Sequence, residues 1–372
     1  MTISSTMQKI CDERWQPLDA TCEQSNSRSN IRTTVCYLCI EVDDRVLMSQ
    51  VDWLSHLLQI ITITGQLEVR CAYGAPWRVT WSQAAANEIP YHVIVKGRAI
   101  IEFPETRTAR ELVSGDIVLI PHGAAHVLHD GSGQTPIRTQ EHRRYAGWVL
   151  SENEGEGEQL DLMCGRFFIA PPHDRLIRNY MPADLVTRAM NGHGEDGIDS
   201  ASNQLASLVR LMRMESSGDR AGGRAILNAL SSALFTLVLR AASEGDGPPE
   251  GLLALAGHPR LAPAIAAMFA DPARSWKLPD LADLCGMSRA TFMRHFQDRL
   301  GCSALDLLTD LRMSLAANEL KKPAISTEAV AETVGYQSVS AFRRVFAERM
   351  GMTPGEWRRL AHNGEHRAWS ET

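Results

Sequence analysis

Two stretches of the chain repeat one arrangement of serine, glycine, aromatic and arginine residues. The stretches are residues 278–301 and residues 326–351. Each has a short amphipathic helix pattern, a glycine, a serine two or three positions later, and then an apolar and basic helix pattern. A serine can cap a helix and leave backbone N–H groups for a phosphate, and an arginine can donate two hydrogen bonds to guanine. These residues therefore suit nucleic-acid recognition.

The spacing inside each unit predicts a helix-turn-helix. An alanine lets the helices approach, a glycine supports a left-handed turn, and a serine caps the second helix. These residues are Ala282, Gly286 and Ser288 in the first unit and Ala331, Gly335 and Ser338 in the second. The apolar anchors are Leu281, Leu284, Phe292, Phe296, Val330, Val334, Phe342 and Phe346. The pattern leaves Arg289, Arg294, Arg343 and Arg344 to face outward.

A helix predicted over residues 305–322 joins the two units. Two recognition helices on one rod can enter successive major-groove faces of B-DNA, about 34 Å apart. One unit alone would be weak evidence, whereas the duplication strongly favours an all-α domain that binds double-stranded DNA. The alternative is that the arginines only solvate a helix face.

Residues 276–359, including the ending GYQSVSAFRRVFAERMGMTPGEWRR, resemble the AraC/XylS family of transcriptional regulators. The resemblance implies base-reading positions at Ala290, Met293 and Arg294 in the first unit, with Arg289 near the backbone. In the second unit it implies Val339, Ser340, Arg343 and Arg344, with Ser338 on a phosphate. Because Ala290 and Met293 depart from the polar or aromatic residues often found there, base reading by the first unit would rest mainly on Arg294.

The sequence from about residue 66 to 170 reads as short strands separated by turns. The candidates are LEVRC, WRVTW, YHVIVKG, AIIEF, DIVLI and FFIA. Without long helices between them, they predict an antiparallel sandwich or barrel. Within it, GDIVLIPHGAAHVLHD matches the second cupin motif through Gly115, Pro121, Gly123 and His126.

His92, His122 and His126 are the candidate metal ligands, because three imidazoles suit zinc, copper or iron. The first cupin motif is incomplete, however, and only His92 stands where two histidines and a glutamate would be found. We therefore favour a barrel without a metal and expect no cofactor.

Residues 173–251 contain two apolar helical stripes and end in a linker, EGDGPPEG. Periodicity does not assign a partner to a stripe. A helical hairpin packed on the barrel and a homodimer interface are weighed equally.

The order of these parts resembles cupin-type AraC regulators, and EVRCAYGAPWRV and LMCGRFFIAPP resemble their reactive-chlorine-sensing, RclR-like branch. That resemblance implies that Cys71 and Cys164 sense an oxidant. Arg70 and Arg166 flank the two thiols, although neighbours along a strand point to opposite faces. Two buried structural thiols are the equal alternative.

The fold class expected is α+β with two domains: an N-terminal cupin β-barrel with a helical pair and a C-terminal all-α double helix-turn-helix domain. The boundaries are 1–47 for an unmatched, disordered extension, 48–172 for the cupin sensor domain, 173–251 for the helical pair and linker, and 252–372 for the DNA-binding domain.

The net charge of −6 conceals an uneven distribution. Residues 1–251 hold 23 Lys and Arg against 31 Asp and Glu, whereas residues 252–372 hold 15 against 13. A net charge of only +2 predicts weak non-specific DNA binding, so affinity would depend on a few placed arginines.

We expect a cytoplasmic regulator, not an enzyme, that responds to an oxidant or small ligand. No run of about 18 apolar residues predicts a membrane span. The expected partner is double-stranded DNA, with RNA polymerase added if the protein is an activator. The alternatives are a metal-dependent cupin enzyme with a DNA-binding appendage and a constitutive DNA-binding dimer.

Overall fold

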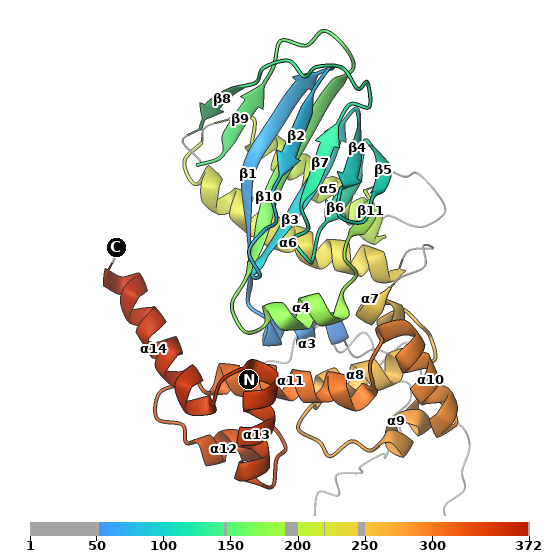
Figure 1. The fold of residues 1–372 in the computed structure, drawn as a ribbon, viewed down its shortest axis with the longest axis vertical. Helices are drawn as coiled ribbons and strands as arrows, with labels where there is room; N and C mark the ends of the chain where they lie inside the picture. Colours follow the sequence, from blue (N-terminus) through green and yellow to red (C-terminus); the bar gives the residue numbers. More distant parts are fainter. Residues whose placement is uncertain (1–51, 145–146, 190–199, 219, 245–249, 371–372) are drawn as a thin grey trace, which may run out of the picture. The chain divides into compact units, whose positions relative to one another are not determined.

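Eleven strands in the N-terminal half form two sheets (Figure 1). The structure is a computed structural model that describes residues 52–370, except residues 145–146, 190–199, 219 and 245–249, with side chains described to residue 362. The prediction of a disordered extension at residues 1–47 concerns residues outside this range.

The larger sheet has seven strands, and every pairing within it is antiparallel except that of β1 with β9. From edge to edge they are β11 (Leu185–Arg188), β6 (Asp116–Leu119), β3 (Glu88–Lys96), β10 (Gln159–Ile169), β1 (Ile63–Gly74), β9 (Val149–Glu152) and β8 (Gln140–Arg143).

The smaller sheet has four antiparallel strands. In order they are β2 (Arg78–Trp81), β7 (His126–His129), β4 (Arg98–Phe103) and β5 (Thr108–Val113). Apolar side chains of both sheets form one buried cluster, with Ile94 and Leu162 from the larger sheet and Ile101 and Leu128 from the smaller. The predicted sheet-rich half is confirmed.

The pairing of β1 with β10 contains a β-bulge. Leu67 pairs with Gly165 and Val69 pairs with Cys164, so Glu68 is the extra residue on β1. A bulge changes which face of the sheet the following side chains occupy. Beyond it, Cys71 lies on the same face as Cys164, toward the cluster between the sheets.

Two helices, α5 (Ala201–Glu215) and α6 (Gly223–Glu244), pack on each other, and α6 packs on β1. The Gly65 N–H donates to Ser232 Oγ at 2.9 Å, and Tyr91 Oη lies 3.0 Å from Ser231 Oγ. The hairpin interpretation is therefore confirmed for the buried stripe of α6. Outside this packing, three large apolar side chains remain exposed: Leu211, Met214 and Ile226.

By length and composition alone, α6 could cross a membrane, and it is the one described helix that passes this test. Leu234, Phe235 and Val238 of α6 are fully buried in the protein core. The helix thus has an apolar face because it covers a sheet.

The C-terminal part is entirely helical among the described residues. Its helices are α7 (Gly251–Ala256), α8 (Ala262–Ala270), α9 (Leu278–Leu284), α10 (Arg289–Leu300), α11 (Ala304–Glu319), α12 (Thr327–Thr333), α13 (Val339–Met350) and α14 (Pro354–Ser370). Ser303 caps α11, and Asp306 bonds back to the Ser303 N–H, which forms a capping box. The α+β fold class with two domains is confirmed.

The close approach of α6 to β1 depends on the absence of a side chain at Gly65. A Cβ atom there would lie 2.6 Å from the Ser231 carbonyl carbon. We predict that Gly65→Ala lowers the free energy of unfolding by about 1–3 kcal/mol, because α6 must move off the sheet. Urea denaturation followed by circular dichroism measures this. The control is Gly355→Ala, where a Cβ meets nothing within 4 Å. Equal stability of the two variants would contradict the packing argument.

Candidate DNA-binding surface and sensor site

Both predicted helix-turn-helix units are present. The first consists of α9 and α10 and the second of α12 and α13. The turn glycines have φ values of 57° at Gly286 and 80° at Gly335, in the left-handed region that favours glycine. The alanines Ala282 and Ala331 are buried at the helix contacts. The predicted roles of these four residues are confirmed.

The predicted serines cap the two recognition helices. Ser288 Oγ accepts from the Thr291 N–H at 3.2 Å, and Ser338 Oγ accepts from the Ala341 N–H at 3.3 Å. Each cap satisfies one of the four N–H groups that a helix leaves unpaired at its N-terminus. The remaining N–H groups at these ends point along the helix axis, as phosphate binding requires.

Nine of the ten predicted DNA contacts are exposed. On α10 and its cap these are Ser288, Arg289, Ala290, Met293 and Arg294, and on α13 and its cap they are Ser338, Ser340, Arg343 and Arg344, of which Ser338 and Ser288 are the caps already described. Val339 differs, because it is half-buried and packs against the apolar cluster around Phe342. Its side chain therefore contributes to the domain core as well as to the surface.

Arg343 is held by a carboxylate on the neighbouring helix. Its Nη2 lies 3.0 Å from Glu328 Oε1, and both side chains are more than half exposed. An ion pair this exposed contributes about 0–1 kcal/mol, so a DNA phosphate or base can replace the carboxylate. Glu328 is a residue that the sequence analysis missed. Its place one helix before Arg343 in the repeat is a signal that could have identified it.

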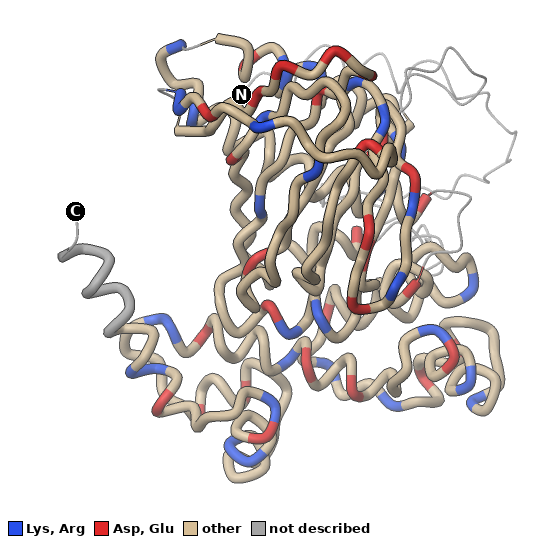
Figure 2. Tube along the Cα trace, turned by 45° about the horizontal axis from the view of Figure 1, so that its top comes forward, with Lys and Arg blue, Asp and Glu red and all other residues tan. Residues whose placement is uncertain are grey.

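Charges of both signs are mixed along the C-terminal helices (Figure 2). This agrees with the net charge of +2 for residues 252–372. The surface is not strongly basic, so helix caps and individual arginines must supply most of the DNA affinity.

The two candidate sensor thiols lie side by side on paired strands. Cys71 pairs with Leu162, and Cys164 pairs with Val69, so the cysteines are diagonal neighbours on one face. Both thiols are buried. A hydrogen bond with Cys164 lowers the pKa of Cys71, whereas burial raises the pKa of Cys164 well above its usual value. Cys71 is therefore the thiol that ionises more readily.

The arginines beside these cysteines do not activate them. Arg70 pairs with Asp161 at 2.8 Å, and Arg166 pairs with Glu68 at 2.8 Å and with Glu88 at 2.7 Å. Arg70 is next to Cys71 on β1 and points to the opposite face, whereas Arg166 is two residues from Cys164 on β10 and lies on the same face, at the cavity. Carboxylates neutralise both guanidinium groups.

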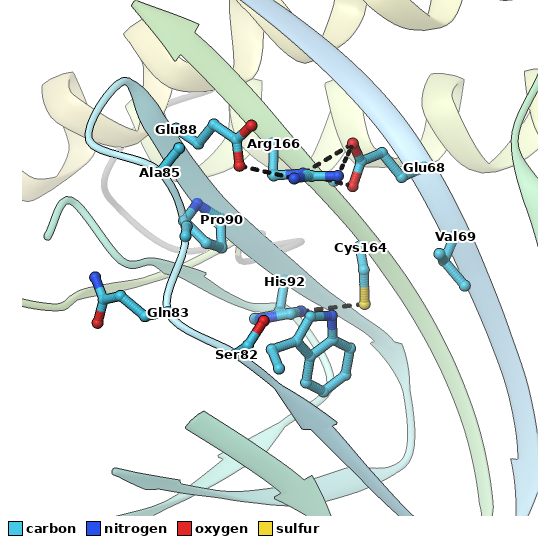
Figure 3. Close-up of a pocket in the computed structure, with 13 residues that line it drawn as sticks. Glu68, Val69, Ser82, Gln83, Ala85, Glu88, Pro90, His92, Cys164 and Arg166 are labelled. Carbon is cyan, nitrogen blue, oxygen red and sulfur yellow. Dashed lines mark hydrogen bonds and ion pairs between the residues drawn. The ribbon is translucent and has the colours of Figure 1, made fainter. Parts of the chain in front are cut away.

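Two of the three candidate metal ligands meet. His92 Nε2 lies 2.7 Å from His126 Nε2. On its other side, His92 Nδ1 lies 3.1 Å from Cys164 Sγ (Figure 3). His122 is directed elsewhere, with its Nε2 3.2 Å from the Met181 carbonyl oxygen. The predicted three-histidine site is therefore not assembled, and no group of three His, Cys, Asp or Glu suited to a metal occurs among the described residues.

A cavity of about 320 Å³ opens beside His92 and Cys164. Glu88 and Arg166 also line it (Figure 3), and so does Trp81. The Trp81 ring stacks on His126 with a centroid distance of 5.3 Å and meets His92 edge-on at 4.7 Å. The sequence analysis missed Trp81, which ends the WRVTW strand and pairs with His126 of β7 in the same sheet.

Two short helices connect the thiol-bearing strands to the C-terminal part. Helix α3 (Trp53–Ile60) precedes β1, and α4 (Asp174–Tyr180) follows β10. Asn318 of α11 bonds to both regions: its Nδ2 donates to the Ile60 carbonyl oxygen at 2.7 Å, and its Oδ1 lies 2.8 Å from His173 Nε2. One side chain thus contacts the start of β1 and the end of β10.

A second contact reaches the end of the recognition helix α13. The Tyr180 hydroxyl donates to Asp310 Oδ2 at 2.5 Å, and Arg349 Nη1 lies 3.3 Å from Asp310 Oδ1. Burial raises the pKa of Asp310, and burial also lowers the pKa of His173 to about 4. His173 is therefore neutral near pH 7 and accepts or donates only as a neutral imidazole.

In comparison with known proteins, each half of the chain matches a protein family. Residues 52–244 match the family profile described as Cupin, and residues 281–360 match the profile described as a helix-turn-helix domain.

Three relatives align with most of the chain. An uncharacterized HTH-type transcriptional regulator of Haemophilus influenzae is 29% identical, covering 84% of this chain and 99% of its own. The RCS-specific HTH-type transcriptional activator RclR of Escherichia coli is 27% identical, covering 82% and 97%. The HTH-type transcriptional regulator MtrA of Neisseria gonorrhoeae is 30% identical, covering 83% and 98%.

These relatives are named as regulators, so the alternative of a cupin enzyme is not supported. Together with the paired helix-turn-helix units, the matches show that this chain belongs to the AraC family of DNA-binding transcriptional regulators and carries an N-terminal cupin domain.

Proposed function

We propose that the protein is an oxidant-responsive transcriptional regulator in which Cys71 and Cys164 form the sensor. The observation that carries this proposal is the placement of the two thiols as diagonal neighbours on one face of β1 and β10. The name of the E. coli relative, an RCS-specific activator, supports an oxidant as the signal. We further propose a cytoplasmic location and activation through RNA polymerase.

Formation of a disulfide would strain the strand pairing. Diagonal neighbours in an antiparallel pair have Cα atoms about 7–8 Å apart, whereas a disulfide requires about 4.4–6.8 Å. The two strands must therefore shift along each other or rearrange at the bulge around Glu68. This shift is the conformational change that the signal would cause.

The shift has a direct route to the DNA-binding half. Because β1 follows α3 and β10 precedes α4, moving the strands changes the distance between Ile60 and His173. Asn318 bonds to both residues and belongs to α11, the helix that joins the two helix-turn-helix units. A signal can change DNA affinity only if it favours one of two states, and this contact distinguishes them.

A homodimer stays a prediction. The exposed apolar side chains Leu211, Met214 and Ile226 on α5 and α6 are where such an interface would form. A constitutive DNA-binding protein is the remaining alternative to the sensor.

Substitution of either thiol tests the sensor. We predict that Cys71→Ser and Cys164→Ser each abolish the change in DNA binding that hypochlorous acid causes, because neither variant can form the disulfide. Gel-shift titration on the gene's upstream DNA before and after oxidant, with thiol mapping by mass spectrometry, measures this. Cys285→Ser, which removes a buried thiol of the DNA-binding domain, is the control. An unchanged response in both sensor variants, or none in the parent protein, would favour the constitutive alternative.

The ion pair at the second recognition helix generates another prediction. Arg343→Ala should weaken specific DNA binding by about 1–3 kcal/mol, because a base contact is lost. Glu328→Gln should strengthen binding by up to about 1 kcal/mol, because Arg343 no longer has a competing carboxylate. Fluorescence anisotropy with labelled operator DNA measures both. Binding that is unchanged in Arg343→Ala would exclude this arginine from the interface.

Asn318 tests the route between the halves. We predict that Asn318→Leu still forms the disulfide but binds DNA with a smaller difference in affinity between the reduced and oxidised states, because the bonds from α11 to Ile60 and His173 are lost while the Tyr180–Asp310 bond remains. The readout is the ratio of the two dissociation constants. Lys322→Ala, an exposed change just after the same helix, is the control. A redox ratio equal to that of the parent protein would refute the route.

A further inference from the structure

The hydrogen bonds around Cys164 determine where its neighbours hold their protons. His126 Nδ1 lies 2.8 Å from the Ala124 carbonyl oxygen, which can only accept, so this nitrogen carries a proton. The other nitrogen of a neutral His126, Nε2, is then an acceptor. Because His92 Nε2 lies 2.7 Å from it, His92 must donate through Nε2.

This fixes the tautomer of His92. With its proton on Nε2, neutral His92 has a lone pair on Nδ1, which lies 3.1 Å from Cys164 Sγ (Figure 3). The Cys164 thiol has one proton, which it can donate either to this nitrogen or to the Cys71 sulfur. Burial lowers the pKa of both histidines, so both are neutral at physiological pH and His92 Nδ1 can accept a hydrogen bond, while the same burial makes His92 a weaker base.

Building on the proposed Cys71–Cys164 sensor, we propose that His92 is the base that takes the proton of Cys164 as the disulfide forms. Cys164 needs such a base because its thiol is fully buried and ionises poorly without help. His126 and Trp81 are positioning residues, since the hydrogen bond from one and the ring contact of the other hold the His92 imidazole.

The reaction balances with a hypohalous acid as the oxidant. The Cys71 thiolate attacks the halogen, an S–halogen bond forms, and hydroxide leaves and is protonated to water. Cys164 then transfers its proton to His92 Nδ1 while its sulfur attacks the Cys71 sulfur. The S–S bond forms, the S–halogen bond breaks, and halide leaves. The two thiols supply the two electrons that reduce the halogen.

The charge that arises on His92 can be shared. Protonated His92 still donates through Nε2 to His126 Nε2, so the positive charge can pass along this hydrogen bond. The Trp81 ring, edge-on to His92 and stacked on His126, lies against both imidazoles. The cavity beside His92 and Cys164 then gives the proton a path to solvent.

Other titratable groups near the pair belong to the same strands and their neighbours. Glu68, Glu88 and Arg166 form the ion-pair cluster at the cavity, and Asp161, Glu141 and Tyr73 act on Cys71. Burial raises the pKa of Tyr73 far above the physiological range, so it remains protonated. Among these groups, His92 is the one with a ring nitrogen in hydrogen-bond contact with the Cys164 thiol.

The test compares rates of disulfide formation in the full-length protein treated with hypochlorous acid. His92→Gln keeps a hydrogen-bonding side chain but removes the base, so the rate at pH 7 should fall about 10²-fold and recover as the pH approaches the raised pKa of the thiol. His92→Ala should be slow as well, and added imidazole should restore its rate through the cavity. His122→Gln is the matched control, because His122 contacts the Met181 carbonyl rather than a thiol.

The outcomes separate this inference from the proposed function. A parent protein that never forms the disulfide overturns the sensor itself. A parent and a His92→Gln variant that form it at the same rate, with the same pH dependence, overturn only the role of His92. Circular dichroism and reduced-state DNA binding establish that each variant is folded, and absence of imidazole rescue in a folded His92→Ala variant also counts against the base.

Discussion

The antiparallel pairing of β1 with β10 is the interaction on which the proposed sensor depends. This one ladder places Cys71 and Cys164 on a common face, and the bulge at Glu68 sets that face. The same two strands connect to α3 and α4, whose ends bond to Asn318. A shift of β1 along β10 at the thiols would therefore displace the two segments that bond to α11. A strand moves along its length more readily than it stretches.

The DNA-binding half could be predicted closely because its determinants are local. The turn glycines, the capping serines and the buried alanines each act within a few residues, so the repeat of their spacing was enough. The partial burial of Val339 was not predictable, since it depends on how α13 packs against the apolar cluster. Glu328 was missed for a related reason: its contact with Arg343 crosses from one helix to the next.

For the N-terminal half, the sequence predicted a sheet-rich fold but not the register between its strands. Strands such as β7 and β9 are only four residues long, too short for a clear alternation, and β5 is mostly exposed. The adjacency of Cys71 and Cys164 depends on a register between strands about 90 residues apart, which no local pattern encodes. His122 was a candidate metal ligand together with His92 and His126, yet its side chain contacts the Met181 carbonyl oxygen instead.

Burial makes a thiol pair more selective for small oxidants but slows its reaction with them. The groups around Cys164 would offset the slower reaction. Burial excludes bulky reagents but also disfavours the thiolate that must react. A neutral imidazole in contact with the thiol supplies a proton acceptor without placing a permanent charge in the core. Coupling between two sites is reciprocal. If forming the disulfide changes the affinity for DNA by some factor, binding DNA changes the equilibrium between thiols and disulfide by the same factor. The operator would thus act on the sensor as much as the sensor acts on the operator, through the same contact at Asn318.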